Sequence, residues 1–263
     1  MELKEILNMI VESERRGGEL ILAARDIIAE NKTDARNVVT EYDRFVQDLM
    51  IEKFRENLSG AHFFCEENDL CESLDAEHVF IIDPIDGTAN FVHGFHHSSI
   101  SCAYASKGEV KAAAIYNPYI NEMFTAIKGE GAFLNGKRIF ASDAGISESI
   151  ALVGTAPYYP DIEEDMFRVM KYAYDKALDI RREGSAALDL CAVASGRTGF
   201  FAELRLSYWD YAAGALIVKE AGGEACACSG KPLPATGEKS SVLAGSKKAV
   251  NEFLKDFPNS EWP

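Results

Sequence analysis

The sequence is short of positive charge, with 27 lysines and arginines against 42 aspartates and glutamates and a formal net charge of −15. Such a surface repels polyanions, so we expect neither nucleic acid nor an anionic membrane as a default partner. Long apolar runs are also missing, because residues 20–24 and 211–218 are far too short to cross a bilayer. The charged residues 1–5 lack the apolar core of a signal peptide. These absences favour a cytoplasmic protein.

The six cysteines show no paired framework and are scattered between residues 65 and 228. This pattern argues against a disulfide-stabilised secreted module and favours reduced thiols. The sequence also has no internal repeat, low-complexity tract or proline-rich linker that would mark a string of separate domains. We therefore expect one functional unit made of two halves, residues 1–145 and 146–263, with a compact junction near residues 140–150.

The first half begins with helical patterns and continues with strand patterns. Apolar residues at helical spacing predict one or two helices before residue 31, with a kink at Gly17-Gly18, and a further helix over residues 43–57. Closely spaced apolar runs then predict strands that pair antiparallel. These strands are residues 79–82, 98–105, 110–116 and 122–127.

In the second half, strands alternate with helices, which is typical of an α/β arrangement with a mostly parallel sheet. Residues 151–153 and 178–180 have the pattern of strands. The predicted helices are residues 162–176, 185–196, 209–221 and 247–255.

The strongest chemical signal is Asp83-Pro84-Ile85-Asp86-Gly87-Thr88, directly after the apolar run of residues 79–82. Proline blocks strand pairing and glycine lets the backbone approach a ligand, so the two carboxylates can converge at the end of a strand. Hard cations such as Mg²⁺ prefer oxygen ligands, and the bent backbone offers the Ile85 carbonyl as another. The alternative is an Asp-rich turn that caps a helix beginning near Gly87.

Three further acids stand in comparable places. Glu66 and Glu67 follow the apolar residues 63–65, and Asp210 stands at the head of a predicted helix. Taken singly, the first two would be a solvated pair and the third an ordinary N-cap. As a cluster they can hold a phosphate only through intervening cations, which indicates a metal-dependent site.

Five sequence blocks, in this order and at roughly this spacing, resemble signatures of the inositol monophosphatase family. The resemblance extends from near residue 30 to near residue 245. It implies a layered αβαβα sandwich, with an antiparallel sheet in the N-terminal half and a mostly parallel sheet in the C-terminal half. The blocks are residues 39–43, 66–67, 82–94, 184–196 and 209–223.

The resemblance also implies a hydrolytic centre with two or three Mg²⁺ ions. Thr88 matches the family threonine that holds the attacking water, Asp43 matches the carboxylate that accepts a hydrogen bond from it, and Glu66 is the third catalytic residue. Glu67 is a neighbour whose role as a ligand is open. The implied metal-binding residues are Glu66, Asp83, Ile85 through its carbonyl, Asp86 and Asp210.

Substrate recognition is implied for residues on both sides of the predicted metal site. Glu203 aligns with the family glutamate that hydrogen-bonds inositol hydroxyls, and Lys32 falls on a loop that is mobile in relatives. The small residues after Gly184 let a polyol approach, although tight packing of a helix start explains the same glycine. The implied substrate-binding residues are Gly87, Thr88, Gly184, Ser185, Ala186, Glu203 and Asp210.

The reaction implied is Mg²⁺-dependent hydrolysis of a phosphate monoester, first of all myo-inositol 1-phosphate, with lithium sensitivity and a homodimer as in relatives. One alternative is another substrate of the superfamily: fructose 1,6-bisphosphate, 3′-phosphoadenosine 5′-phosphate or histidinol phosphate. A second phosphate would need a basic subsite, for which Arg181, Arg182 and Arg205 are the candidates. The other alternative is a regulatory binding protein on the same fold, in transcription or ribosome assembly.

The histidines of residues 93–97 are a second place where metal binding can be considered. A carboxylate-rich Mg²⁺ site does not need imidazole ligands. We therefore expect these histidines to be surface groups or outer neighbours of the site.

Overall fold

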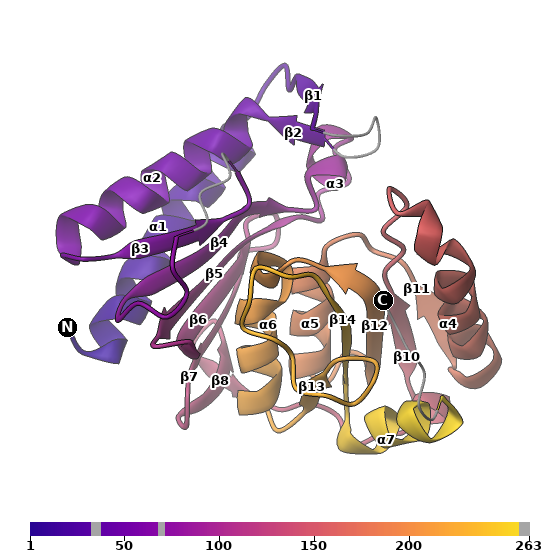
Figure 1. The fold of residues 1–263 in the computed structure, drawn as a ribbon. Helices are drawn as coiled ribbons and strands as arrows, with labels where there is room; N and C mark the ends of the chain where they lie inside the picture. Colours follow the sequence, from indigo (N-terminus) through magenta and orange to yellow (C-terminus); the bar gives the residue numbers. More distant parts are fainter. Residues whose placement is uncertain (33–37, 68–71, 258–263) are drawn as a thin grey trace.

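The computed structural model describes residues 1–32, 38–67 and 72–257, which fold into five layers (Figure 1). Helices α1 and α2 cover one face of a seven-stranded sheet, and α5 and α6 lie between this sheet and a five-stranded one. Helices α4 and α7 cover the outer face of the second sheet. The αβαβα layering predicted from the sequence is confirmed.

Helix α1 (Leu3–Ala23) runs unbroken through Gly17-Gly18, so the kink expected there is absent and one helix precedes residue 31. A Cβ atom at Gly17 would lie 2.6 Å from the Ile100 side chain, and one at Gly18 would lie 2.6 Å from the Tyr116 ring. The two glycines therefore serve close packing of the helix on the sheet. Helix α2 spans Glu41–Asn57, close to the predicted residues 43–57.

The first sheet has the order β3-β4-β5-β6-β7-β8-β9. Strand β3 lies parallel to β4, and every other neighbouring pair is antiparallel, as predicted. A separate small sheet pairs β1 (Ala29–Asn31) with β2 (Val38–Thr40). The strands of the first sheet are β3 (His62–Cys65), β4 (Val79–Asp86), β5 (Ser99–Ser106), β6 (Glu109–Asn117), β7 (Glu122–Ile127), β8 (Gly131–Leu134) and β9 (Lys137–Ile139).

The second sheet has the order β11-β10-β12-β14-β13. Strand β14 runs opposite to its neighbours and the other four strands run the same way, so the sheet is mostly parallel. The sequence patterns do not identify β12 or β14. The strands are β10 (Ile150–Val153), β11 (Asp179–Arg181), β12 (Phe200–Leu206), β13 (Glu224–Cys226) and β14 (Ser240–Gly245).

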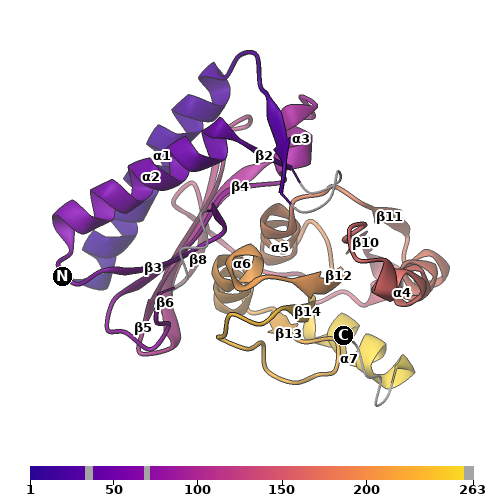
Figure 2. The same ribbon diagram turned by 45° about the horizontal axis from the view of Figure 1, so that its top comes forward.

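The remaining helices connect these strands, and Figure 2 shows α5 and α6 side by side between the sheets. None of the helices in the described ranges is both long and apolar enough to cross a membrane. The helices are α3 (Thr88–Val92), α4 (Glu163–Lys176), α5 (Ala186–Ala194), α6 (Tyr208–Glu220) and α7 (Lys247–Asp256), with 3₁₀ turns at Ile146–Glu148 and Pro160–Ile162.

Three apolar cores hold the layers together. Strand β4 is buried on both faces, so its alternate side chains enter different cores: Phe80 packs under α1 and α2, and Ile81 packs under α5 and α6. Strand β12 is shared in the same way, with Phe201 facing α5 and α6 and Phe200 facing α4 and α7. The ends of these two buried strands are therefore fixed on both sides.

The buried carboxyl of Glu14 on α1 should make the free energy of unfolding depend on pH, because this residue is 0% exposed. Burial raises its pKa well above 4.5, and the Cys102 backbone and Arg15 offset this only in part. The folded chain thus holds the proton more tightly, and stability falls as pH rises through the folded pKa. Between the unfolded and the folded pKa of Glu14, we expect Glu14→Gln to gain stability over the native chain by about 1.4 kcal/mol per pH unit, with no further gain above the folded pKa.

Urea unfolding across a pH series measures this difference. Glu19→Gln, an exposed glutamate on the same helix, is the matched control and should follow the native profile. Parallel profiles for native chain and Glu14→Gln would contradict the prediction.

Candidate active site

A cavity of about 180 Å³ lies between the two sheets, where β4 ends and α5 and α6 begin. Among the predicted site residues that do not line it, Asp43 and Ser185 are each one hydrogen bond behind a lining side chain, and so is Lys32. The predicted residues that line the cavity are Glu66, Asp83, Ile85, Asp86, Gly87, Thr88, Gly184, Ala186, Glu203 and Asp210.

The end of β4 is irregular, and this irregularity places two carboxylates in the cavity. Its pairing register with β5 shifts between Asp83 and Asp86, where Pro84 removes a backbone donor. In a regular strand, residues three apart point to opposite faces. The shift lets both aspartates line the same cavity. The carboxylate of Asp83 also accepts a 3.1 Å hydrogen bond from the Ile85 N–H.

Six carboxylates line this cavity, and four of them are the predicted metal ligands Glu66, Asp83, Asp86 and Asp210. Burial raises the pKa of Asp83 well above its usual range, with Glu66, Asp86 and Asp210 adding to the effect. Burial, followed by Glu66 and Asp86, also raises the pKa of Asp210. Cations bound at this point would favour the ionised carboxylates. An all-oxygen donor set of this kind fits Mg²⁺.

The first turn of α5 supports Asp86. The Ser185 hydroxyl and the Ala187 N–H, at 2.9 Å, both donate to Asp86 Oδ2. These bonds favour the ionised carboxylate and partly oppose the burial that raises its pKa to about 6. Ser185 also caps the helix by accepting from the Leu188 N–H. One small side chain thus begins α5 and orients a carboxylate of the other sheet.

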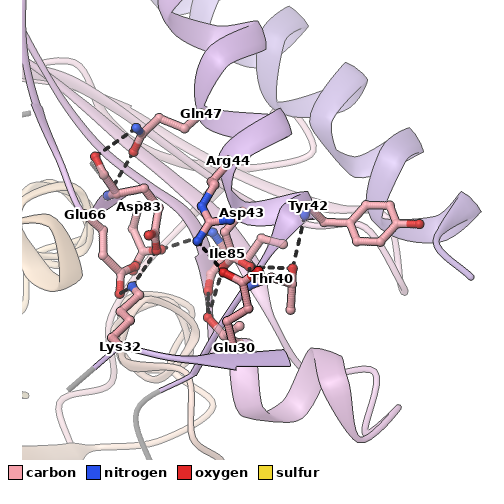
Figure 3. Close-up of polar contacts among 12 residues, drawn as sticks. Glu30, Lys32, Thr40, Tyr42, Asp43, Arg44, Gln47, Glu66, Asp83 and Ile85 are labelled. Atoms are coloured by element: carbon pink, nitrogen blue, oxygen red, sulfur yellow. Dashed lines mark hydrogen bonds and ion pairs between the residues drawn. The ribbon is translucent and has the colours of Figure 1, made fainter. Parts of the chain in front are cut away.

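Lys32 supplies a cation at the edge of this cluster (Figure 3). Its ammonium lies 2.8 Å from Glu66 Oε1 and 2.5 Å from Glu67 Oε1. Burial lowers the pKa of Lys32, but the two glutamates outweigh this and raise it. The acidic cluster therefore attracts a positive group in the chain itself. Mobility of the predicted loop stays a prediction, and residues 33–36 lie outside the described residues.

Asp43 and Thr88 form a hydrogen-bonded pair behind the cavity. The Thr88 hydroxyl lies 3.1 Å from Asp43 Oδ1 and 3.0 Å from the Ile85 carbonyl oxygen. The other carboxylate oxygen of Asp43 accepts from the Thr40 N–H at 2.7 Å and from its hydroxyl at 2.6 Å, which caps α2 (Figure 3). Burial raises the pKa of Asp43 to about 6, against the lowering effect of Thr40.

The opposite side of the cavity comes from the second sheet. Glu203 on β12 is buried, which raises its pKa to about 7 although Arg182 lowers it. A Cβ atom at Gly154 would lie 1.9 Å from Glu203 Oε2, so glycine is needed beneath this carboxylate. Arg182 lines the cavity and donates from Nε to Thr155 Oγ1 at 3.0 Å.

The three candidate arginines thus differ in their surroundings. Arg181 pairs with Asp179, and Arg205 pairs with Asp161 at 2.7 Å. Arg182 is the one of the three that lines the cavity. A second phosphate would therefore meet one guanidinium of this set rather than a basic cluster.

A family model decides what this arrangement belongs to. The model of the inositol monophosphatase family matches residues 2–261. The chain belongs to this family.

Relatives of this family member agree with the assignment. The putative Nus factor SuhB of Neisseria meningitidis serogroup B is 36% identical over 260 residues, covering 96% of this chain and 98% of the relative. The crystal structure of extragenic suppressor protein suhB from Bartonella henselae superposes with a TM-score of 0.90 at 30% identity, covering 97% and 99% of the two chains. An IMPase from Thermotoga maritima gives a TM-score of 0.84 at 34% identity, covering 96% and 99%.

Several cavity residues of this inositol monophosphatase family member are not among those predicted from the sequence. Gly154, Pro157 and Tyr158 follow β10, and Asp189 lies on α5. The position after a parallel strand is itself a signal, because ligands bind at the carboxyl ends of such strands. Asp189 gives no signal, since one acid in an apolar helix is not distinctive.

A substitution at Gly87 tests how closely the backbone of the first half must approach that of the second half at this site. Its φ of 88° is left-handed, and an added Cβ would lie 2.9 Å from the Gly184 carbonyl oxygen and 3.2 Å from that of His97. We expect Gly87→Ala to lower the free energy of unfolding by about 2–4 kcal/mol, since strain and a backbone clash add.

Gly94→Ala is the matched control, because Gly94 also has positive φ and a Cβ atom added there would have no other atom within 4 Å. It should lose about 1 kcal/mol, from backbone strain alone. Urea unfolding measures both variants, and equal losses would show that the close approach at Gly87 does not matter.

Proposed function

We propose that this protein hydrolyses a phosphate monoester with the help of Mg²⁺, and that myo-inositol 1-phosphate is the substrate to test first. The observation that carries the proposal is that four mutually repelling carboxylates and the Thr88–Asp43 pair meet at one cavity. The carboxylates can bind cations that neutralise a phosphate, and the Thr88–Asp43 pair can hold a water molecule by hydrogen bonds. Membership of a phosphatase family supports the same reaction.

Glu66, Asp83, Asp86 and Asp210, with the Ile85 carbonyl, would hold two or three Mg²⁺ ions. When bound, the ions supply charge neutralisation of the phosphoryl oxygens and acidity for water. The chain's own part is to keep these oxygens oriented without a metal. Ser185 and Ala187 hold Asp86, the Ile85 N–H holds Asp83, and the Ser207 N–H holds Asp210 at 2.6 Å.

Asp43 and Thr88 would deliver the attacking water. The Thr88 hydroxyl donates its proton to Asp43 Oδ1 and accepts one from the water, whose oxygen forms the new bond to phosphorus. As this bond forms, the bond from phosphorus to the ester oxygen breaks on the opposite side, and the leaving alkoxide takes up a proton from solvent water. A single in-line displacement of this kind inverts the configuration at phosphorus. A pKa of about 6 keeps Asp43 ionised at neutral pH, as a base requires.

The leaving group would lie toward Gly184, Ala186 and Glu203. These residues combine backbone exposed by small side chains with one buried carboxylate, a combination that suits the hydroxyl groups of a polyol. A single lining arginine, Arg182, favours one phosphate over two, although bisphosphate substrates remain part of the test. We also propose residues 1–145 and 146–263 as the two halves of this unit, and a homodimer as its assembly.

A second candidate function is regulatory binding. The observation that favours it is that the Neisseria relative, 36% identical, is called a putative Nus factor. The hydrolytic residues would then be retained on a protein whose main task is to bind a partner in transcription. The two functions differ in whether the biological effect needs the carboxylates of the cavity.

Phosphate release is the direct test, with and without Mg²⁺, on inositol 1-phosphate, fructose 1,6-bisphosphate, 3′-phosphoadenosine 5′-phosphate and histidinol phosphate. We expect Mg²⁺-dependent release that falls more than about hundredfold in Asp86→Asn, since a ligand that touches both ion and helix is lost. Asp48→Asn, an exposed aspartate on α2, is the control and should keep native activity.

Release from another substrate of the panel would keep the mechanism and replace inositol phosphate. If the native chain released no phosphate from any of them, hydrolysis would be refuted. Rescue of a deletion phenotype by Asp86→Asn as good as by the native gene would then assign the biological role to binding.

Proton release should accompany Mg²⁺ binding. Without metal, the pKa of Asp86 is about 6, and those of Asp83 and Asp210 are raised well above their usual range. Ions that bind these groups displace their protons, so the apparent affinity should rise with pH, by up to about tenfold per unit for each proton displaced. Calorimetry in two buffers of different ionisation enthalpy measures the protons released.

Asp86→Asn should release fewer protons under the same conditions, because one titrating ligand is gone. An affinity that stays constant between about pH 5.5 and 7.5, with no net proton release, would contradict the proposed ligand set.

A further inference from the structure

A second cluster of metal-ligating side chains lies beside the catalytic cavity, which one of its members, Asp189, also lines. His97, Glu183 and Asp189 each bring one ligand atom within 4.8 Å of the others, and they form the one such group within residues 1–32, 38–67 and 72–257. His97 precedes β5, Glu183 precedes α5, and Asp189 lies on α5. Two segments therefore converge here, the residues before β5 and the residues that lead into α5.

Two polar atoms of this cluster lack partners. Asp189 is 2% exposed, and its Oδ1 atom accepts no hydrogen bond from any described residue. His97 Nε2 is buried and makes no hydrogen bond of good geometry, although Glu183 Oε2 lies 3.2 Å away. Buried polar groups without partners are costly, and a native structure usually explains each of them by a ligand, a water or a function.

The nearby cations are committed elsewhere. Arg197 pairs with Glu122, and Arg181 pairs with Asp179. Within the part of the chain that the structure describes, no lysine or arginine forms a salt bridge with Glu183 or Asp189. The two carboxylates thus face one imidazole and form no ion pair with a lysine or arginine of the described residues, although the Arg182 guanidinium is near enough to lower the pKa of Asp189.

The backbone around the cluster is fixed by one amide. Asn90 Nδ2 donates to the carbonyl oxygens of His97 and Glu183, at 2.7 Å each. Gly87 packs against the same two segments, since its missing Cβ would approach the oxygens of Gly184 and His97. The ligand-bearing segments are therefore held in place before any ion arrives, as a built site requires.

We propose that His97, Glu183 and Asp189 bind one transition-metal dication of the Zn²⁺ class, at a site that adjoins the hydrolytic centre through Asp189 but shares none of the ligands proposed there. One imidazole with two carboxylates is a donor set for Zn²⁺, Mn²⁺ or Fe²⁺, whereas Mg²⁺ prefers oxygen ligands throughout. Tetrahedral ligand bonds of about 2.0–2.2 Å separate two donor atoms by about 3.3–3.6 Å. The ligand atoms lie within 4.8 Å of one another, so side-chain movements of about 1 Å would close the cluster on an ion.

Access and protonation agree with this assignment. His97 and Glu183 line a cavity of about 310 Å³, which gives an ion and its water ligands a way in. Burial lowers the pKa of His97, so its imidazole is neutral and able to ligate. Burial also raises the pKa of Asp189, and a cation at this point would favour the ionised form.

The position of the site gives the ion a structural task. Asp189 lies one turn after Ser185, which together with Ala187 holds Asp86 in the catalytic cavity. An ion shared by Asp189, His97 and Glu183 would tie α5 to the segments around it. Occupancy should therefore raise the melting temperature of the protein, because the ion binds the folded chain only.

Co²⁺ is the probe, because its visible absorption reports the coordination number and an imidazole ligand. The full chain is titrated with Co²⁺ in saturating Mg²⁺, and melting temperature is measured alongside. We expect one Co²⁺ per chain with a ligand-field spectrum, a higher melting temperature, and an affinity at least about tenfold weaker in His97→Gln. His93→Gln, an exposed histidine four residues earlier, is the matched control and should bind as the native chain does.

The Asp86→Asn variant distinguishes Co²⁺ binding at this site from Co²⁺ binding at the hydrolytic centre. It should keep the Co²⁺ spectrum although phosphatase activity is lost. If His97→Gln fails to fold, Glu183→Gln replaces it, because Glu183 is partly exposed. Equal Co²⁺ binding by the native chain and the folded variant, loss of the spectrum in Asp86→Asn, or no Co²⁺ bound by the native chain would each overturn the proposal.

Discussion

Repulsion among four carboxylates, two buried and two partly buried, is the constraint on which the candidate site depends. Glu66, Asp83, Asp86 and Asp210 come from three parts of the chain, and folding brings them to one cavity at a cost in desolvation and like-charge energy. The surrounding structure offsets part of that cost with hydrogen bonds from backbone N–H groups and from Ser185, and Lys32 adds a positive charge at Glu66. What remains uncompensated is the driving force for binding cations. The site is thus strained by charge in a way that a metal relieves.

The packing of β4 and α5 between the layers makes this convergence possible. Strand β4 carries Asp83 and Asp86 and is packed on both faces, so its irregular end is held in place by two cores at once. Helix α5 begins at that end and supplies the groups that orient Asp86. Because α5 also packs in the layer between the two sheets, the position of a single carboxylate depends on contacts from both halves of the chain.

Much of this could be read from the sequence, and the failures have physical reasons. The hexapeptide beginning at Asp83 and the five blocks of family resemblance led to the correct fold and to residues that do gather at one cavity. Strand β12 was missed because Glu203 interrupts a buried apolar run, and its burial follows from the cavity rather than from any periodicity. The kink expected in α1 was wrong because Gly17 and Gly18 permit close packing instead of a bend. The cluster at Asp189 was missed because the histidines of residues 93–97 were considered by themselves, whereas His97 meets Glu183 and Asp189, about 90 residues further on, only in three dimensions.

The seam between the two sheets has an evolutionary consequence. The residues proposed to orient water, Asp43 and Thr88, belong to the first half, whereas Gly154, Arg182 and Glu203 on the opposite wall belong to the second. Each wall rests largely on an apolar core of its own. If the proposed division of roles holds, substitutions on the second wall would change the phosphate ester that is bound and leave the proposed hydrolytic residues intact. A fold divided in this way allows a lineage to diversify its substrates by drift on one side of a cleft, without passing through inactive ancestors.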